Sequence, residues 1–173
     1  MPAMISPGCA KPASSTPDTE ELPKYTVTRR VGFSPAQLFA VVADVGSYKE
    51  FLPLVERSTV RDRRVLEAGG ERFSADLLIG YQRMGIQEVF ASDVETHNAE
   101  HTVRAVSTGN AVKRLVSSWV ITPASKQSSD IAFTVDYEMK SAMLQMVMGT
   151  LFSSAAQKIM SAFEARARKL YGT

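Results

Sequence analysis

Residues 141–173 read SAMLQMVMGTLFSSAAQKIMSAFEARARKLYGT, and the rest of the chain is best understood around them. Apolar residues recur here at intervals of three and four, which places side chains on one face of an α-helix. These residues are Leu144, Val147, Met148, Leu151, Phe152, Ala155, Ile159, Phe163, Ala167 and Leu170. Methionine is unbranched and polarizable, so it fills core gaps or adapts to changing apolar partners. Because five of the eight methionines lie in or just before this stretch, it predicts one long helix with an adaptable apolar face.

Strands are predicted upstream of this helix. Alternation of β-branched or aromatic residues with polar ones marks residues 25–31, 54–66, 71–81, 84–96, 100–108, 112–122 and 130–140. The last six strands are separated by short segments, namely Gly69-Gly70, Arg83-Met84, His97-Asn98, Gly109-Asn110 and residues 124–129. Strands joined by such short links must pair as antiparallel neighbours.

Two short helices are predicted after the strand at residues 25–31. Residues 34–37 read Ser-Pro-Ala-Gln, which supplies an N-cap serine, a proline at the first helical position and the glutamine of a capping box. That helix should run to about Asp44. Ser47 and Glu50 have the spacing of a second capping box, which predicts a further single turn.

This order of elements predicts an α+β fold. A curved antiparallel sheet of about seven strands should wrap around the long C-terminal helix, with the two short helices closing one end. This arrangement is a helix-grip, and it implies a space between the helix and the concave face of the sheet.

Composition divides the chain into two parts. Residues 1–23 alternate proline with Ser, Ala and Thr, which predicts a disordered extension without a secretory signal; the only cysteine, Cys9, lies in it. Residues 24–173 are expected to form one domain with 19 basic and 15 acidic groups, since the extension holds one of the 20 basic and three of the 18 acidic residues. No apolar run is long enough to span a membrane. We expect a cytoplasmic protein, peripheral at the inner membrane.

The inward phase of the strands is apolar and faces the methionine-rich helix. It comprises Phe73, Ala75, Leu77, Ile79, Tyr81, Ile86, Phe90, Leu115, Trp119, Ile121, Ile131, Phe133, Val135 and Tyr137. Each of these side chains alone is compatible with plain core. Together, apolar walls with a few tyrosine hydroxyls have the composition of a pocket for a large apolar ligand.

Several short motifs carry a resemblance to a known family. They are Tyr48-Lys49-Glu50-Phe51-Leu52-Pro53, Trp119 with Thr122-Pro123, and Phe163-Glu164-Ala165-Arg166-Ala167 followed by Leu170-Tyr171-Gly172. In this order they resemble the coenzyme Q-binding branch of the polyketide cyclase-like START superfamily, over residues 24–172. The chain departs from the family at Leu54, where an aromatic residue is common, and at residues 110–112, where Gly-Pro-aromatic is common.

The resemblance implies a bacterial protein that binds ubiquinone or a similar prenyl lipid in an apolar cavity. It would support respiratory electron transport as a chaperone or carrier, without catalysis and without a further cofactor. The expected ligand-binding residues are Tyr48, Lys49, Phe51, Leu52, Phe73, Leu77, Ile79, Phe90, Trp119, Phe133, Tyr137, Met143, Val147, Met148 and Leu151. Residues 48–53 are interpreted as a gate in which Lys49 reaches a carbonyl or a headgroup; the alternative is that Phe51 and Leu52 merely plug the core.

Catalytic motifs are largely lacking in the sequence. There is no phosphate-binding glycine loop, no metal-spaced cysteine set and no nucleophile elbow. His97 and His101 are four residues apart, but they flank an expected turn rather than share a helix face, so no metal site is expected. Glu88 is in phase with Phe90 and would be a buried carboxylate, unless a bulge turns it to solvent.

Basic residues suggest two further function classes. Arg57, Arg61, Arg63 and Arg64 crowd one strand, which is typical of a solvated face but also suits an anionic membrane or RNA. Relatives in the same family resemble ribosome-associated toxins, for which the partner would be the ribosome. Distant members resemble polyketide cyclases or aromatases, which would need a carboxylate or hydroxyl deep in the cavity.

Overall fold

The computed structural model describes residues 24–81 and 85–172, and it shows seven strands, two α-helices and one 3₁₀ helix in that part of the chain. The predicted disorder of residues 1–23 and the turn at Arg83-Met84 lie outside the described residues, as do the side chains of Tyr81 and Ile86. The elements are β1 (Lys24–Val31), α1 (Pro35–Ala43), η1 (Val45–Glu50), β2 (Val55–Val65), β3 (Gly70–Tyr81), β4 (Ile86–His97), β5 (Thr102–Thr108), β6 (Val112–Ser125), β7 (Ser128–Met139) and α2 (Ala142–Tyr171).

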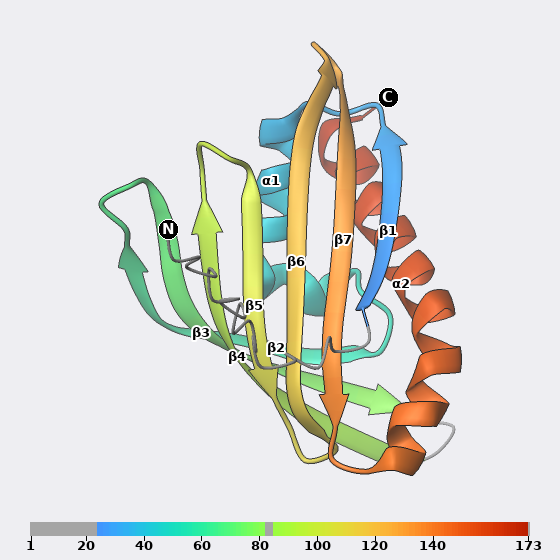
Figure 1. Ribbon diagram of the computed structural model, residues 1–173. Coiled ribbons are helices and arrows are strands. Elements are labelled where there is room, and N and C mark those ends of the chain that lie inside the picture. Colours follow the sequence, from blue (N-terminus) through green and yellow to red (C-terminus); the bar gives the residue numbers. More distant parts are fainter. Residues whose placement is uncertain (1–23, 82–84, 173) are drawn as a thin grey trace, which may run out of the picture.

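One antiparallel sheet runs in the order β1-β7-β6-β5-β4-β3-β2 (Figure 1). Strands that are consecutive in the chain are neighbours from β2 to β7, and β1 pairs with β7 at one edge. The sheet curves around α2, which packs against β1, β7 and α1. The predicted α+β helix-grip fold with seven strands is therefore confirmed.

The start of α1 follows from local sequence, as predicted. Ser34 Oγ accepts a hydrogen bond from the Gln37 backbone N–H, and Gln37 Oε1 accepts one from the Ser34 backbone N–H at 3.0 Å. The second predicted capping box is wrong. Ser47 lies inside η1, and its hydroxyl donates to Asp44 Oδ2 at 2.6 Å instead of accepting from a helix N–H.

Helix α2 is buried on one face only in its second half. Ala156, Met160, Phe163 and Ala167 are buried, whereas Val147 is 45% exposed. The prediction of one continuous buried face is therefore wrong for the first half of α2, for Ala155 and for Leu170 at its end. The exposed large hydrophobic residues of α2 are Met143, Met146, Val147, Leu151, Leu170 and Tyr171. Apolar residues near the start of α2 occupy more than one side of the helix, and at about 100° per residue Val147 lies roughly 160° around the axis from Phe163.

Candidate functional site

The concave face has a closed half, which we define by the side chains of Tyr48, Phe51, Trp119, Phe133 and Phe163. The Trp119 ring stacks on Phe133 with centroids 4.2 Å apart, and Phe163 of α2 lies 4.6 Å from Trp119. Phe163 also meets Tyr48 edge-on at 5.2 Å and Phe51 at 5.1 Å. The structure thus brings four of the predicted ligand-binding residues together, but as a close-packed aromatic cluster around Phe163.

Tyr48 is fixed within the closed half. It is 8% exposed, and its hydroxyl donates a hydrogen bond to the backbone carbonyl of Val42. Burial raises the pKa of Tyr48 above its ordinary value of 10.0, and the negative charge of Asp44 adds to the rise. The side chain is therefore held as a neutral donor inside the core.

Residues 48–53, the turn interpreted above as a gate, are held against α2 by Arg166. The Arg166 guanidinium lies 5.3 Å from the centre of the Phe51 ring and forms an ion pair with Glu50 at 2.7 Å. Leu52 is half-buried, and Lys49 is exposed. These contacts favour the alternative in which the turn plugs the closed half. Lys49 is exposed to solvent and has no ion-pair partner among residues 24–81 and 85–172.

Phe73 lies apart from this cluster, beneath the end of β2. It is 2% exposed, and the Arg63 guanidinium lies 4.7 Å above its ring. Arg63 in turn forms an ion pair with Glu71. Phe73 is thus a core residue capped by an arginine.

The open half of the concave face, as we name it, comprises Leu77, Ile79, Phe90 and Leu115. The strand register places Leu77 opposite Phe90, and Leu115 opposite the buried Tyr137, so all four face inward. Nevertheless, all four are only half-buried. These side chains are only half-buried because α2, the helix that covers the concave face, packs against β1 and β7 at the far edge of the sheet. An accessible apolar surface therefore remains on the inner side of β3, β4 and β6.

Tyr137 marks the border between the two halves. Its ring stacks on Phe152 of α2 with centroids 4.4 Å apart and planes 9° from parallel. Burial raises the pKa of the Tyr137 hydroxyl. Met148, which is half-buried, packs against the same core, so of the two methionines predicted to bind the ligand, Met143 and Met148, it is the one that reaches the core.

The other predicted residues of α2 do not reach the inner face. Met143 is 69% exposed and Leu151 is 53% exposed, and with Val147 they follow one another at intervals of four on the outer side of the helix. We name these three side chains the outer stripe. Because the outer stripe is exposed to solvent, its position does not support the expected role of these residues in lining a cavity.

Three polar residues interrupt the open half on its inner side. Glu88 is 9% exposed and lies opposite Ile79 with no bulge, so the alternative that turned it to solvent is wrong. Ser92 and Ser107 are buried and share a hydrogen bond of 2.7 Å between their hydroxyls. Sequence analysis missed the serine pair, although Ser92 follows Phe90 at the inward spacing of two.

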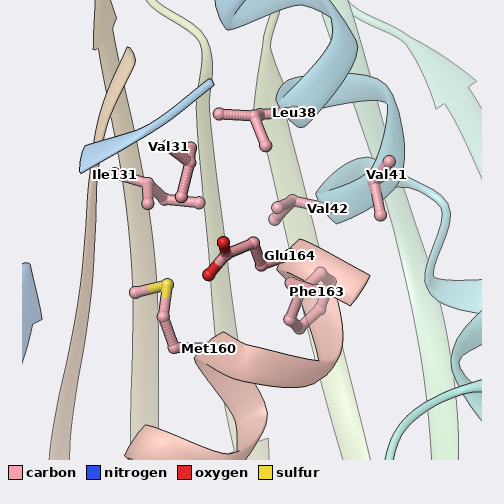
Figure 2. A pocket seen from close by; sticks show the side chains of 8 residues that line it. All are labelled: Val31, Leu38, Val41, Val42, Ile131, Met160, Phe163 and Glu164. Carbon is pink, nitrogen blue, oxygen red and sulfur yellow. The ribbon is translucent and has the colours of Figure 1, made fainter. Parts of the chain in front are cut away.

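A small pocket lies elsewhere, between α1, β1, β7 and α2 (Figure 2). It is lined by Val31, Leu38, Val41, Val42, Ile131, Met160, Phe163 and Glu164. Its volume of about 10 Å³ suffices for one water molecule at most. Its one charged residue, Glu164, accepts a hydrogen bond from Arg29 at 3.1 Å and pairs with Arg168. The pocket is a packing defect beside an ion pair and has no room for a lipid.

The two histidines lie at the opposite end of β4 from Glu88. His97 Nε2 is 2.8 Å from Glu95 Oε1, and the His101 ring meets Phe39 edge-on at 5.7 Å. Over residues 24–81 and 85–172, no cluster of three or more His, Cys, Asp or Glu side chains could hold a metal ion. Neither α1 nor α2 is apolar enough over sufficient length to cross a membrane.

Comparison with known proteins places this geometry in context. Residues 31–164 match the family described as polyketide cyclase / dehydrase and lipid transport. The ribosome association toxin RatA of Escherichia coli K12 is 27% identical over 150 residues, which are 87% of this chain and 90% of RatA. The mitochondrial coenzyme Q-binding protein COQ10 of Drosophila melanogaster is 29% identical over 151 residues, which are 86% of this chain and 60% of COQ10.

A solved structure of a START superfamily protein from Mycobacterium smegmatis has the same fold. Its TM-score is 0.72 at 18% identity, and the match covers 85% of this chain and 98% of that one. The expected START-like fold is therefore confirmed.

Proposed function

The chain belongs to the polyketide cyclase / dehydrase and lipid transport family, and on this premise we propose that it binds ubiquinone or a similar prenyl lipid. The ligand would lie against the open half of the concave face. In this role the protein is a carrier or chaperone that supports respiratory electron transport, and it performs no chemistry on its ligand.

The observation that carries the proposal is the partial exposure of Leu77, Ile79, Phe90 and Leu115 on the inner side of the sheet. Apolar surface that remains in contact with water is stabilised by any apolar partner that covers it. A prenyl chain has the shape and chemistry to do so. The similarity to COQ10, a coenzyme Q-binding protein, supports a quinone as the lipid.

The outer stripe supports contact with a membrane from which such a lipid is drawn. Met143, Val147 and Leu151 expose apolar side chains near the start of α2. Between Met139 and Phe163 the sequence has no acidic residue, so nothing in that stretch repels an anionic lipid surface. We propose that α2 touches the membrane at this stripe while the open half receives the lipid.

A role without catalysis fits the polar groups near the open half. Glu88 is the one carboxylate there among the described residues, and the hydroxyls of Ser92 and Ser107 hydrogen-bond to each other. His97, which could act as a base, is nine residues from Glu88 along β4, roughly 30 Å away. A cyclase or aromatase would need a carboxylate or hydroxyl deep in the cavity, and Glu88 provides a buried carboxylate. However, in the described part of the chain it has no second acid or base beside it.

Binding can be tested with a series of quinones that differ in tail length. Each fully buried isoprene contributes roughly 4 kcal/mol at about 0.8 kcal/mol per carbon, before the cost of ordering the chain. We expect affinity for the full-length protein to rise over the first few isoprenes and then to level off, because a long tail outgrows the face that it covers. Titration by Trp119 fluorescence measures this, since the protein has a single tryptophan and it lies on β6 four residues from Leu115 of the open half. Equal affinity for a tail-less ring and a three-isoprene analogue would falsify the proposal.

A ribosomal partner is the second candidate, and the convex face of the sheet favours it. Strand register aligns Arg64, Arg72, Glu95 and Arg104 in one row across β2 to β5. In the described part of the chain the three arginines are exposed and have no ion-pair partner. By contrast, Arg61 of the basic strand is neutralised by Asp76. Similarity to RatA, a ribosome association toxin, adds support.

The triple variant Arg64→Gln, Arg72→Gln, Arg104→Gln distinguishes the two candidates. If the second candidate holds, the variant should lose co-sedimentation with the large ribosomal subunit and its salt dependence, because arginine contacts to phosphate release counterions. Arg61→Gln is the matched control, since that side chain is already paired. If the native protein does not sediment with ribosomal subunits at low salt, the second candidate is excluded.

A further inference from the structure

Glu88 presents one bound and one free carboxylate oxygen on the inner side of β4. Oε1 accepts a hydrogen bond of 2.9 Å from the backbone N–H of Ala111, in the connection between β5 and β6. Within the described residues, Oε2 has no hydrogen-bond partner and no cation pairs with the carboxylate. At 9% exposure, the side chain is nine-tenths buried.

The surrounding backbone holds the carboxylate in this position. A Cβ atom at Gly109 would lie 2.6 Å from Glu88 Oε1, so the absence of a side chain there makes room for the carboxylate. The space left by Gly109 and the hydrogen bond from Ala111 both concern the same oxygen, Oε1. The direction of the other oxygen is therefore set by the fold. Among the described residues, Ser58 Oγ is the one fully buried side-chain N or O atom that lacks a partner, so Glu88 Oε2 keeps some accessible surface, where a ligand can reach it.

The neighbours of Glu88 are the apolar residues of the open half. Ile79 lies opposite it on β3, and Phe90 is the next inward residue on β4. The serine pair lies farther along, since Ser92 is four residues from Glu88, about 13 Å along the strand. A ligand that covers Ile79 and Phe90 therefore meets Glu88 as its polar contact.

From this geometry we propose that Glu88 selects ligands that carry a hydroxyl donor, and thus the hydroquinone form of a prenyl quinone over the quinone form. A carboxylate only accepts hydrogen bonds. The ring of a quinone offers carbonyl oxygens, which also only accept, whereas the ring of a hydroquinone offers two hydroxyl protons. The inference rests on the proposed lipid binding, and it specifies which redox form of the lipid the site prefers.

Two alkyl-substituted probes test this inference on the full-length protein under anaerobic conditions. The probes are decyl-benzohydroquinone and the corresponding decyl-benzoquinone, with the dimethyl ether of the hydroquinone as the analogue that lacks donors. We expect the hydroquinone to bind on the order of tenfold more tightly than either of the others, because a hydrogen bond to a charged acceptor is formed only with that probe.

The variant Glu88→Gln changes the free oxygen with little change of shape. Its amide oxygen can still accept from Ala111, while its NH₂ group takes the place of the free acceptor and donates instead. We therefore expect the preference for the hydroquinone to vanish or to reverse toward the quinone. Glu67→Gln is the matched control, because Glu67 is exposed in the turn between β2 and β3.

The outcomes separate this inference from the proposed function. If none of the probes binds, the proposed lipid binding fails and the inference fails with it. If all three probes bind the native protein equally, or if the quinone binds best, lipid binding stands and the role of Glu88 is refuted. The comparison of hydroquinone with its dimethyl ether uses only the native protein, so it decides the question even if Glu88→Gln does not fold.

Discussion

The closed and open halves of the concave face belong to one sheet and follow the same inward alternation, yet they differ in burial. Trp119 and Phe133 are buried beneath Phe163 of α2. Leu77 and Phe90 point to the same side of the sheet and are only half-buried. Strand phase therefore determines which side chains face inward, whereas the covering helix determines which of them become core.

The two halves of α2 repeat this contrast. Its second half lays Met160 and Phe163 against the closed half, and its first half exposes Met143 and Val147. In Figure 1 the start of α2 lies at the same lower end of the molecule as the end of β3 and the start of β4. The end of the molecule where the helix is least buried is thus also the end where the sheet is most accessible, which is why we assign ligand binding there.

The largest loss of stability is expected from a substitution that disrupts the packing of the closed half. Phe163→Ala removes a buried ring that contacts Tyr48, Phe51 and Trp119, so we expect it to lower the free energy of unfolding by about 3–5 kcal/mol. Phe90→Ala in the open half should cost only about 1–2 kcal/mol, because that ring is half-buried. Urea unfolding followed by circular dichroism measures both variants. The same Phe90→Ala variant should bind the three-isoprene quinone less tightly, and a cost equal to that of Phe163→Ala would show that the open half is core.

Local features of the fold were predictable from the sequence. Alternation and turn residues predicted seven strands, and residues 34–37 predicted the start of α1, because these signals act within a few positions along the chain. Ser47 misled for the same reason, since its spacing to Glu50 fitted a capping box while its hydroxyl was engaged by Asp44.

Features that depend on contacts far apart in the chain were not predictable. Helix geometry alone separates Val147 from Phe163 by roughly 160° around the axis. Which of the two sides is buried depends on where the helix lies across β1 and β7, so the sequence did not reveal it. The phase of Glu88 was visible, but its bond to Ala111 was not, because the two residues meet only when β4 lies beside the connection between β5 and β6. The candidate site was thus predicted as a cavity between the sheet and α2, and the orientation of Glu88 was left open between that cavity and solvent.

A smaller loss of stability is expected for Tyr48→Phe, which tests how tightly the closed half is packed compared with the open half. Tyr48→Phe removes the hydroxyl that donates to Val42 and leaves that buried carbonyl without its partner, so we expect a loss of about 1–2 kcal/mol near neutral pH. Tyr171→Phe is the matched control, because Tyr171 is 41% exposed at the end of α2 and should change stability little.

The stability difference between the native protein and Tyr48→Phe should depend on pH. The pKa of Tyr48 in the folded protein is raised above the ordinary 10.0, so above pH 10 the unfolded chain loses a proton that the folded protein retains. The stabilising contribution of Tyr48 is thus complete below pH 10 and falls above it, by at most about 1.4 kcal/mol per pH unit. Tyr137 adds a contribution of the same sign, which Tyr48→Phe leaves in place. Urea unfolding at pH 8 and at pH 10.5 should therefore show the difference between native protein and variant shrinking at the higher pH. A constant difference would mean that Tyr48 ionises in the folded state as readily as in the unfolded one, and the closed half would then be open to water as well.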